Sequence, residues 1–198
     1  TKDKKIFFNH YKNHINNICD ILRNIGVNIN TVPVLDVRRK KSHSIIGSRS
    51  FSESSTVVSN LGRLCVGFYN KNKIGTVIKH MPGLGLSKCD SHYKTPIIKA
   101  SKKELTKRDF KPFKACKSLF AMTAHAVYPK YDSYYTATHS KIIINEIIRN
   151  DMNFKGLLIS DDISMKSLKY SLEENALKAI HAGCNLVLHC NGNITEMS

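Results

Sequence analysis

Helical segments alternate with short, fully apolar segments along the whole chain, and this alternation constrains the fold more than any other feature. Residues 6–25 carry apolar side chains at steps of three and four, which marks one face of a helix, and Gly26 is a natural end for that helix. A short apolar run follows, and this helix–strand pattern occurs five times in all. It predicts an α/β fold with a parallel sheet covered by helices. The expected helices begin near residues 6, 56, 101, 140 and 171, and the expected strands cover residues 27–37, 75–78, 119–124, 156–159 and 185–188.

Local signals mark several of these boundaries. Ser101 with Glu104 and Ser171 with Glu174 have the spacing of a capping box, in which a serine and a glutamate satisfy the first backbone N–H groups of a helix. Ser140 is a third candidate cap, and Pro112 is expected to interrupt the helix that starts at Ser101. The polar segment 38–55 is predicted to be a long loop, and long loops in compact domains are usually functional or disordered.

Polar side chains stand where each expected strand ends. The carboxyl ends of parallel strands meet at one edge of a sheet, so groups more than a hundred residues apart are expected to share one pocket. A run of coincidences is the alternative interpretation. The strand-end residues are Asp36, Lys79, His80, His125, Asp161 and His189.

The segment 79–96 is the strongest single candidate for a catalytic loop. It follows an apolar strand, and Pro82, Gly83 and Gly85 let its backbone turn tightly. It closes with Asp90 and His92, a carboxylate two residues from an imidazole, which is a pair suited to general acid/base catalysis near neutral pH. A surface loop with incidental histidines is the alternative.

A carboxylate at the mouth of the sheet adds a second chemical group. Asp161 follows an apolar strand and is suited to act as a nucleophile or as the partner of a cationic centre. A nucleophilic carboxylate with one acid/base is the minimum set for a retaining glycosidase, here with His92 and Asp90 in place of the usual second carboxylate.

Several alternatives stay open at this point. Asp162 is an equal candidate for the reactive carboxylate, because adjacent strand residues face opposite ways and only one of the two points into the pocket. His125 is as readily a buried structural histidine as a ligand, and His189 is more readily structural. A metal site would use His80, His92 and His125 with a carboxylate, but no HExxH or similar spacing supports it.

Composition restricts the remaining classes. At 198 residues the chain is expected to form a single domain, 1–198, with one core, and no apolar run approaches the roughly 18 residues of a membrane span. The net charge of +16 invites a nucleic-acid function, but the lysines are scattered and no compact basic cluster is interleaved with aromatics. The six cysteines are irregularly spaced, without a CxxC pair, so a zinc ribbon or a disulfide framework is not expected.

Ordered motifs over residues 20 to 191 resemble family 3 glycoside hydrolases of the bacterial β-N-acetylglucosaminidase type. The strongest is Lys-His-Met-Pro-Gly-Leu-Gly at 79–85, followed by Asp-Ser-His at 90–92. A lone PGxG would be weak, whereas the ordered set is specific. The other segments that agree, in the family's order, are Pro-Val-Leu-Asp-Val at 33–37, Ile-Gly-Ser-Arg-Ser-Phe at 46–51, Met-Thr-Ala-His at 122–125, Ser-Asp-Asp-Ile-Ser-Met at 160–165 and Ala-Gly-Cys-Asn-Leu-Val-Leu at 182–188.

This resemblance implies a (β/α)8 TIM-barrel fold and a retaining exo-glycosidase. By resemblance, Asp161 is the nucleophile that forms a glycosyl-enzyme intermediate, and His92 is the acid/base with Asp90 as its partner. Arg49, Lys79 and His80 would bind the sugar hydroxyls. The implied substrate is terminal β-linked N-acetylglucosamine on muropeptides recycled in the bacterial cytoplasm, with no metal or organic cofactor and with no nucleic-acid or membrane partner.

The chain also departs from the family pattern. Leu84 stands where the family usually has a histidine, and Tyr-Thr-Ala-Thr at 135–138 stands where it has Asn-Pro-Ala-Thr. About five of the eight βα units are present, so the chain, which begins at Thr1 rather than Met, is expected to be a fragment of an incomplete barrel. The alternative function is an inactive remnant that acts at most as a sugar- or partner-binding module.

Overall fold

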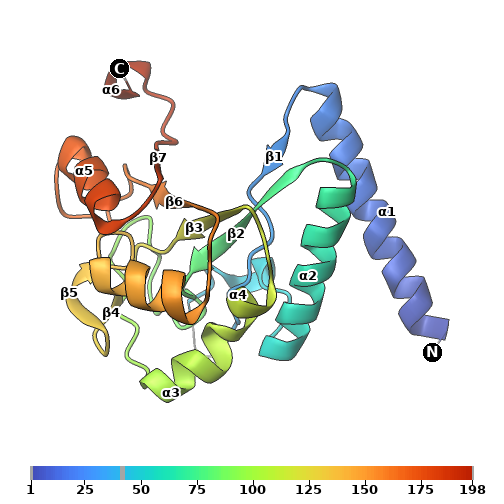
Figure 1. The fold of residues 1–198 in the computed structure, drawn as a ribbon, viewed down its shortest axis with the longest axis horizontal. Helices are drawn as coiled ribbons and strands as arrows, with labels where there is room; N and C mark the ends of the chain where they lie inside the picture. Colours follow the sequence, from blue (N-terminus) through green and yellow to red (C-terminus); the bar gives the residue numbers. More distant parts are fainter. Residues whose placement is uncertain (1, 41–42, 198) are drawn as a thin grey trace.

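A five-stranded parallel sheet forms the centre of the molecule (Figure 1). The computed structural model describes residues 2–40 and 43–197, so Thr1 and part of the expected 38–55 loop lie outside it. The strand order is β1-β2-β3-β6-β7, which is the order along the chain. An incomplete (β/α)8-type fold is therefore confirmed, as a curled half-barrel with five strands. The strands are β1 (Ile29–Asn30), β2 (Gly75–Met81), β3 (Phe120–Thr123), β6 (Leu157–Asp162) and β7 (Leu186–Leu188).

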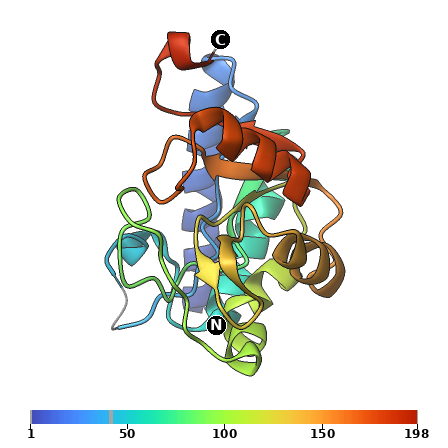
Figure 2. The ribbon, with the colours of Figure 1, turned by 90° about the vertical axis from the view of Figure 1, so that its left-hand side faces the viewer.

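Helices lie around the sheet (Figure 1). In Figure 1, α1 and α2 lie side by side at one end of the sheet, and Figure 2, viewed from the side of α5, has α1 on the far side. No helix among residues 2–40 and 43–197 is both long and apolar enough to cross a membrane. The α-helices are α1 (Lys2–Asn24), α2 (Ser55–Lys71), α3 (Lys102–Glu104), α4 (Lys111–Ala115), α5 (Leu172–Ala182) and α6 (Ile194–Met197). Two segments are π-helical, η2 (Leu105–Asp109) and η3 (Ile143–Asp151), and η1 (Gly47–Arg49) is a 3-10 turn.

The predicted helix caps are present to different degrees. At α5 both halves of the capping box form: the Ser171 hydroxyl accepts from the Glu174 N–H, and the Ser171 N–H donates to the Glu174 carboxylate, each at 3.3 Å. At α3 only the Ser101 half forms, at 3.2 Å. Pro112 lies in the first turn of α4, where a backbone N–H has no partner within the helix, and the helical segment is broken at Phe110, so the expected interruption is confirmed.

The first strand is shorter than the expected 27–37. Pro33 has no N–H to donate to a neighbouring strand, so regular pairing stops before it. Beyond the proline the chain stays beside β2 through one bridge, with the Leu35 N–H donating to the Lys79 carbonyl at 2.7 Å. Asp36 therefore still arrives next to the end of β2.

The sequence patterns also missed the antiparallel hairpin of β4 (Val127–Tyr128) and β5 (Asp132–Thr136). It is small and its second strand is largely exposed, so it lacks the apolar run that marks the parallel strands. Ser140, the predicted cap of the following helix, accepts from the Ile143 N–H at 3.2 Å and donates to Asp132 of the hairpin at 2.6 Å.

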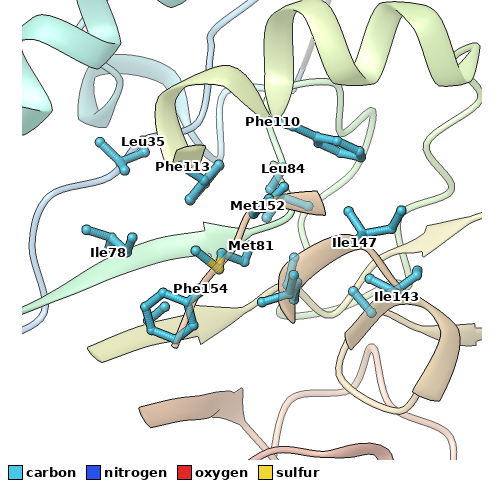
Figure 3. Close-up of a cluster of buried hydrophobic side chains, with 14 of the residues drawn as sticks. Leu35, Ile78, Met81, Leu84, Phe110, Phe113, Ile143, Ile147, Met152 and Phe154 are labelled. Atoms are coloured by element: carbon cyan, nitrogen blue, oxygen red, sulfur yellow. The ribbon is translucent and has the colours of Figure 1, made fainter. Parts of the chain in front are cut away.

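The main core lies between the sheet and the helices that follow it (Figure 3). Leu84 is 2% exposed and lies among the apolar side chains of this core, near Phe110 and Phe113 in Figure 3. The leucine at this position is therefore a packing residue. Removing such a buried side chain typically costs a few kcal/mol.

Buried His139 makes the fold sensitive to acid. Burial lowers the pKa of His139 from 6.5 to about 4, and its Nε2–H donates to the Asn175 carbonyl at 3.1 Å. Between pH 6.5 and 4 the unfolded chain binds a proton that the folded chain rejects, so stability falls as pH falls through this window. We expect about 2 kcal/mol of stability to be lost, less than the full shift implies, because His139 borders an open groove.

Urea unfolding at several pH values tests this expectation. His139→Gln keeps a donor for Asn175 but removes the titrating group, so its stability relative to the wild type is expected to rise by about 2 kcal/mol as the pH falls from 6.5 to 4. Burial raises the pKa of Asp109 to about 6, an effect of opposite sign that is common to both proteins and cancels in the difference. The exposed His10→Gln is the control, and its free energy of unfolding is expected to vary with pH as that of the wild type does. The same pH dependence in His139→Gln would contradict the assignment to His139.

Candidate active site

Lys79, near the end of β2, lies among charged side chains from other segments of the chain. Burial lowers the pKa of its amine, the negative charges of Asp161 and Asp36 raise it, and the positive charge of Arg49 lowers it. These three groups come from three other segments of the chain, yet all lie within electrostatic reach of one amine. The structure thus brings residues 36, 49, 79 and 161 together.

The two aspartates at the end of β6 differ in their surroundings. The Asp162 carboxylate accepts from the backbone N–H groups of Ser164 and Cys190 at 3.0 and 3.2 Å, and from the Ser164 hydroxyl at 2.8 Å. The Asp161 carboxylate accepts only the adjacent Asp162 N–H, at 2.9 Å, among the described residues. Asp162 therefore holds the loop after β6, and Asp161 keeps its oxygens available.

His125 is held inside the protein directly beneath this pair. Its Nδ1 lies 2.7 Å from the Thr138 hydroxyl, and its Nε2 lies 2.9 Å from the Asp162 carbonyl. Burial lowers the pKa of His125, and the charge of Asp161 raises it. Because both ring nitrogens are engaged by the protein, His125 is a structural histidine that supports the end of β6.

Asp90 and His92 form a hydrogen-bonded pair on the loop after β2. The His92 Nδ1 lies 2.7 Å from Asp90 Oδ1, and the His92 backbone N–H donates to the same oxygen at 2.8 Å. That backbone N–H is the main reason why the pKa of Asp90 is lowered. The His92 side chain is 58% exposed, so Asp90 orients the ring while Nε2 remains accessible.

The Asp90–His92 loop is hydrogen bonded to the segment that follows β6. The Lys166 N–H donates to the His92 carbonyl at 3.1 Å, and the Thr95 hydroxyl donates to the Ser167 carbonyl at 2.5 Å. Across residues 2–40 and 43–197, no hydrogen bond or ion pair joins His92 to Asp161. The loop is thus tied to the segment that follows the carboxylate.

Arg49 and Lys79 border a pocket of about 390 Å3 between α1 and the start of the sheet. The Arg49 guanidinium is exposed and donates from Nε and Nη2 to the Ile45 carbonyl at 3.0 and 2.6 Å, which directs the fork. Tyr11 and Phe51 supply aromatic walls. A larger hollow of about 1080 Å3, lined by residues that follow β6 and β7, contains His189 but not Asp161, His92 or Lys79.

Two residues near Lys79 were not predicted as site residues. Cys190 is exposed, and burial of part of its thiol, with the charges of Asp162 and Asp161, raises its pKa, while Lys79 lowers it. Its position directly after strand-end residue His189 was the available signal. Asp36 was recognised as a strand-end residue, but its partner His80 lies on a different strand, β2, so the pairing was not visible in the sequence.

Four of the other cysteines are buried, as a small apolar residue is expected to be. Within the described part of the chain, no group of three or more His, Cys, Asp and Glu side chains has an arrangement that would hold a metal ion.

Comparison with known proteins identifies the family to which this chain belongs. A protein named beta-hexosaminidase from Actinobacillus pleuropneumoniae is 34% identical over 173 residues, which are 84% of this chain and 49% of the relative. A family 3 beta-N-acetylglucosaminidase from Paenibacillus sp. superposes with a TM-score of 0.88 at 26% identity, over 92% of this chain and 36% of that one. NagZ from Neisseria gonorrhoeae, solved with N-trifluoroacetyl-D-glucosamine, superposes with a TM-score of 0.80 at 32% identity, over 90% and 52%.

The chain spans about half the length of the curated relatives it matches. The model of the glycosyl hydrolase family 3 N-terminal domain matches residues 12–198. Nearly all of the chain, including the sheet and every residue of the candidate site, lies in this match. The chain belongs to glycosyl hydrolase family 3, as part of its N-terminal domain.

Proposed function

We propose that this chain carries the catalytic residues of a retaining β-N-acetylglucosaminidase. The observation that carries the proposal is the Asp161 carboxylate, which accepts one backbone hydrogen bond and lies within electrostatic reach of the Lys79 amine. The charges of Asp36 and Arg49 also act on this amine. A carboxylate among cationic groups that suit sugar hydroxyls is the arrangement that a glycosyl-enzyme mechanism needs. The names of relatives at 34 and 33% identity support a hexosaminidase.

In the first step, an Asp161 oxygen attacks C1 of the bound sugar, and the bond from C1 to the leaving oxygen breaks. The proton on His92 Nε2 passes to that oxygen. Asp90 supports this role because its lowered pKa keeps it ionised at neutral pH, where it holds the Nδ1–H and stabilises the imidazolium.

In the second step, His92 acts as the base. Water attacks C1, its proton passes to His92 Nε2, and the bond to the Asp161 oxygen breaks, which restores the free carboxylate. Two displacements at C1 leave the product with the configuration of the substrate.

Arg49, Lys79 and His80 are proposed to bind the sugar hydroxyls. Arg49 offers a planar fork and Lys79 a flexible donor, so together they fix the ring relative to Asp161. The finer proposal is that the sugar is the terminal β-linked N-acetylglucosamine of muropeptides, handled in the cytoplasm during peptidoglycan recycling.

Hydrolysis of 4-nitrophenyl N-acetyl-β-glucosaminide by the purified chain tests this function. Proton NMR of the first sugar released is expected to show the β-anomer before mutarotation. Release of the α-anomer would exclude the retaining mechanism. Absence of hydrolysis, with the chain folded by circular dichroism, would favour a sugar-binding module without catalysis.

His92→Ala is expected to affect poor leaving groups most. A 4-nitrophenolate leaves with little protonation, whereas a sugar alcohol needs a full proton, so we expect about 10²–10⁴-fold loss of kcat/KM on a disaccharide and a much smaller loss on the nitrophenyl substrate. Asp90→Asn, which keeps an acceptor beside Nδ1, is the matched control and is expected to give the same trend more weakly. Equal losses on both substrates would assign His92 another role.

A further inference from the structure

His80 is held by a carboxylate that is fully enclosed. Asp36 is 0% exposed, and its Oδ2 lies 2.7 Å from His80 Nδ1. Its Oδ1 accepts the Leu84 N–H at 2.6 Å and is 3.5 Å from the His80 N–H. An ionised carboxylate only accepts hydrogen bonds, so the proton of this contact lies on His80 Nδ1.

The opposite nitrogen of the ring is left for a ligand. Among residues 2–40 and 43–197, His80 Nε2 has no hydrogen-bond partner, and it is not among the polar side-chain atoms that are sealed from solvent. His125 differs, because the protein engages both of its nitrogens. With Nδ1 protonated, a neutral His80 presents a bare Nε2, which is a hydrogen-bond acceptor.

Lys79 and His80 both lie near Asp36, because Asp36 is hydrogen bonded to His80 and its charge raises the pKa of the Lys79 amine. Lys79 supplies only donors. A hydroxyl group both accepts and donates a hydrogen bond, so it matches a lysine donor beside an imidazole acceptor. An anion would match the lysine alone. The acceptor Nε2 of His80 therefore makes a hydroxyl group a better ligand than an anion for Lys79 and His80 together.

We propose that Asp36 is a positioning residue that holds His80 in the Nδ1–H tautomer, so that Nε2 accepts a hydrogen bond from a ligand hydroxyl. This inference deepens the proposed function and rests on it for the identity of the ligand as a sugar. Asp36 acts through His80 and does not touch the ligand.

The tautomer is measured directly by ¹⁵N NMR of the histidine side chains, with His80→Gln used to assign the resonance. The wild type is expected to show a protonated Nδ1 and a bare Nε2 on His80. A protonated Nε2 at neutral pH would overturn the proposal, whether or not the chain hydrolyses any glycoside. This arm therefore separates failure of the proposal from failure of the proposed function.

Asp36→Asn tests the consequence for binding. Its amide still offers an oxygen to Leu84, but turns an NH₂ group toward Nδ1, which favours the Nε2–H tautomer. We expect the NMR signature to switch, and KM for the nitrophenyl substrate to rise about tenfold with kcat changed less than about threefold, as expected for lost binding. In the absence of turnover, the Kd of N-acetylglucosamine is expected to rise by the same factor.

A double variant distinguishes positioning from a general structural effect. In a His80→Ala background, Asp36→Asn is expected to cost no further affinity, because the residue it positions is gone. A full tenfold cost in that background would show that Asp36 acts another way, for example through Lys79, and would overturn the proposal. Ser50→Ala, which removes a 2.7 Å hydrogen bond to the Asp36 carbonyl, is the matched control and is expected to leave the tautomer unchanged.

Discussion

Asp161→Asn is expected to lower kcat/KM for 4-nitrophenyl N-acetyl-β-glucosaminide by at least about a thousandfold, or about 4 kcal/mol in the activation barrier. An amide oxygen is a weak nucleophile, so the glycosyl-enzyme bond does not form at a useful rate. The change is isosteric, and the amide oxygen keeps the bond to the Asp162 N–H, so the fold is expected to be retained. Release of nitrophenol, with circular dichroism beside it, measures both.

Asp162→Asn is the matched control for this experiment. The Asp162 carboxylate is occupied by Ser164 and Cys190, so its loss is expected to loosen the loop after β6 and to leave at least a tenth of the activity. The opposite result, with Asp161→Asn active and Asp162→Asn inactive, would transfer the nucleophile to Asp162. Such an exchange is the alternative that the adjacent carboxylates leave open in the sequence.

Gly85→Ala is expected to destabilise the fold by about 3 kcal/mol, and to lower Tm by about 6–12 °C. A Cβ at Gly85 would lie 2.1 Å from the Val37 carbonyl oxygen and 2.9 Å from the Val37 nitrogen. Both are backbone atoms of a fully buried residue, so the loop must move away from the segment that carries Asp36. Thermal unfolding followed by circular dichroism measures the loss.

Gly67→Ala is the control, because a Cβ there meets nothing within 4 Å on helix α2. Alanine is the better helix former, so this variant is expected to be up to about 1 kcal/mol more stable than the wild type. If Gly85→Ala unfolded at the wild-type temperature, the close approach to Val37 would not constrain the loop.

Much of the fold was predictable because its signals are local. Each parallel strand is a short apolar run, and the caps at Ser171 and Ser140 involve residues three positions apart. The order of helices and strands implied a parallel sheet, and the strand order along the chain followed from it. The Asp90–His92 contact spans two residues, so its formation was also a local matter.

Other features depended on neighbours that are distant in the sequence. The pattern of residues 27–37 was apolar enough for a strand, but pairing was limited to Ile29–Asn30 by the proline that follows. The second strand of the hairpin β4–β5 is largely exposed and carries no continuous apolar run. Leu84 reads as a departure from a family motif, and only its surroundings in the core identify it as a packing residue.

The sequence by itself determined the parallel sheet and the set of polar residues at its strand ends. Both follow from the apolar periodicity of short segments and from the order of these segments along the chain. Only the tertiary structure decided which of those residues engage one another. Asp36 meets His80 across 44 residues, and His125 meets Asp162 across 37. Such pairs depend on the register between adjacent strands and on which polar atoms lose contact with water when they are buried. Both are determined only when the strands have come together.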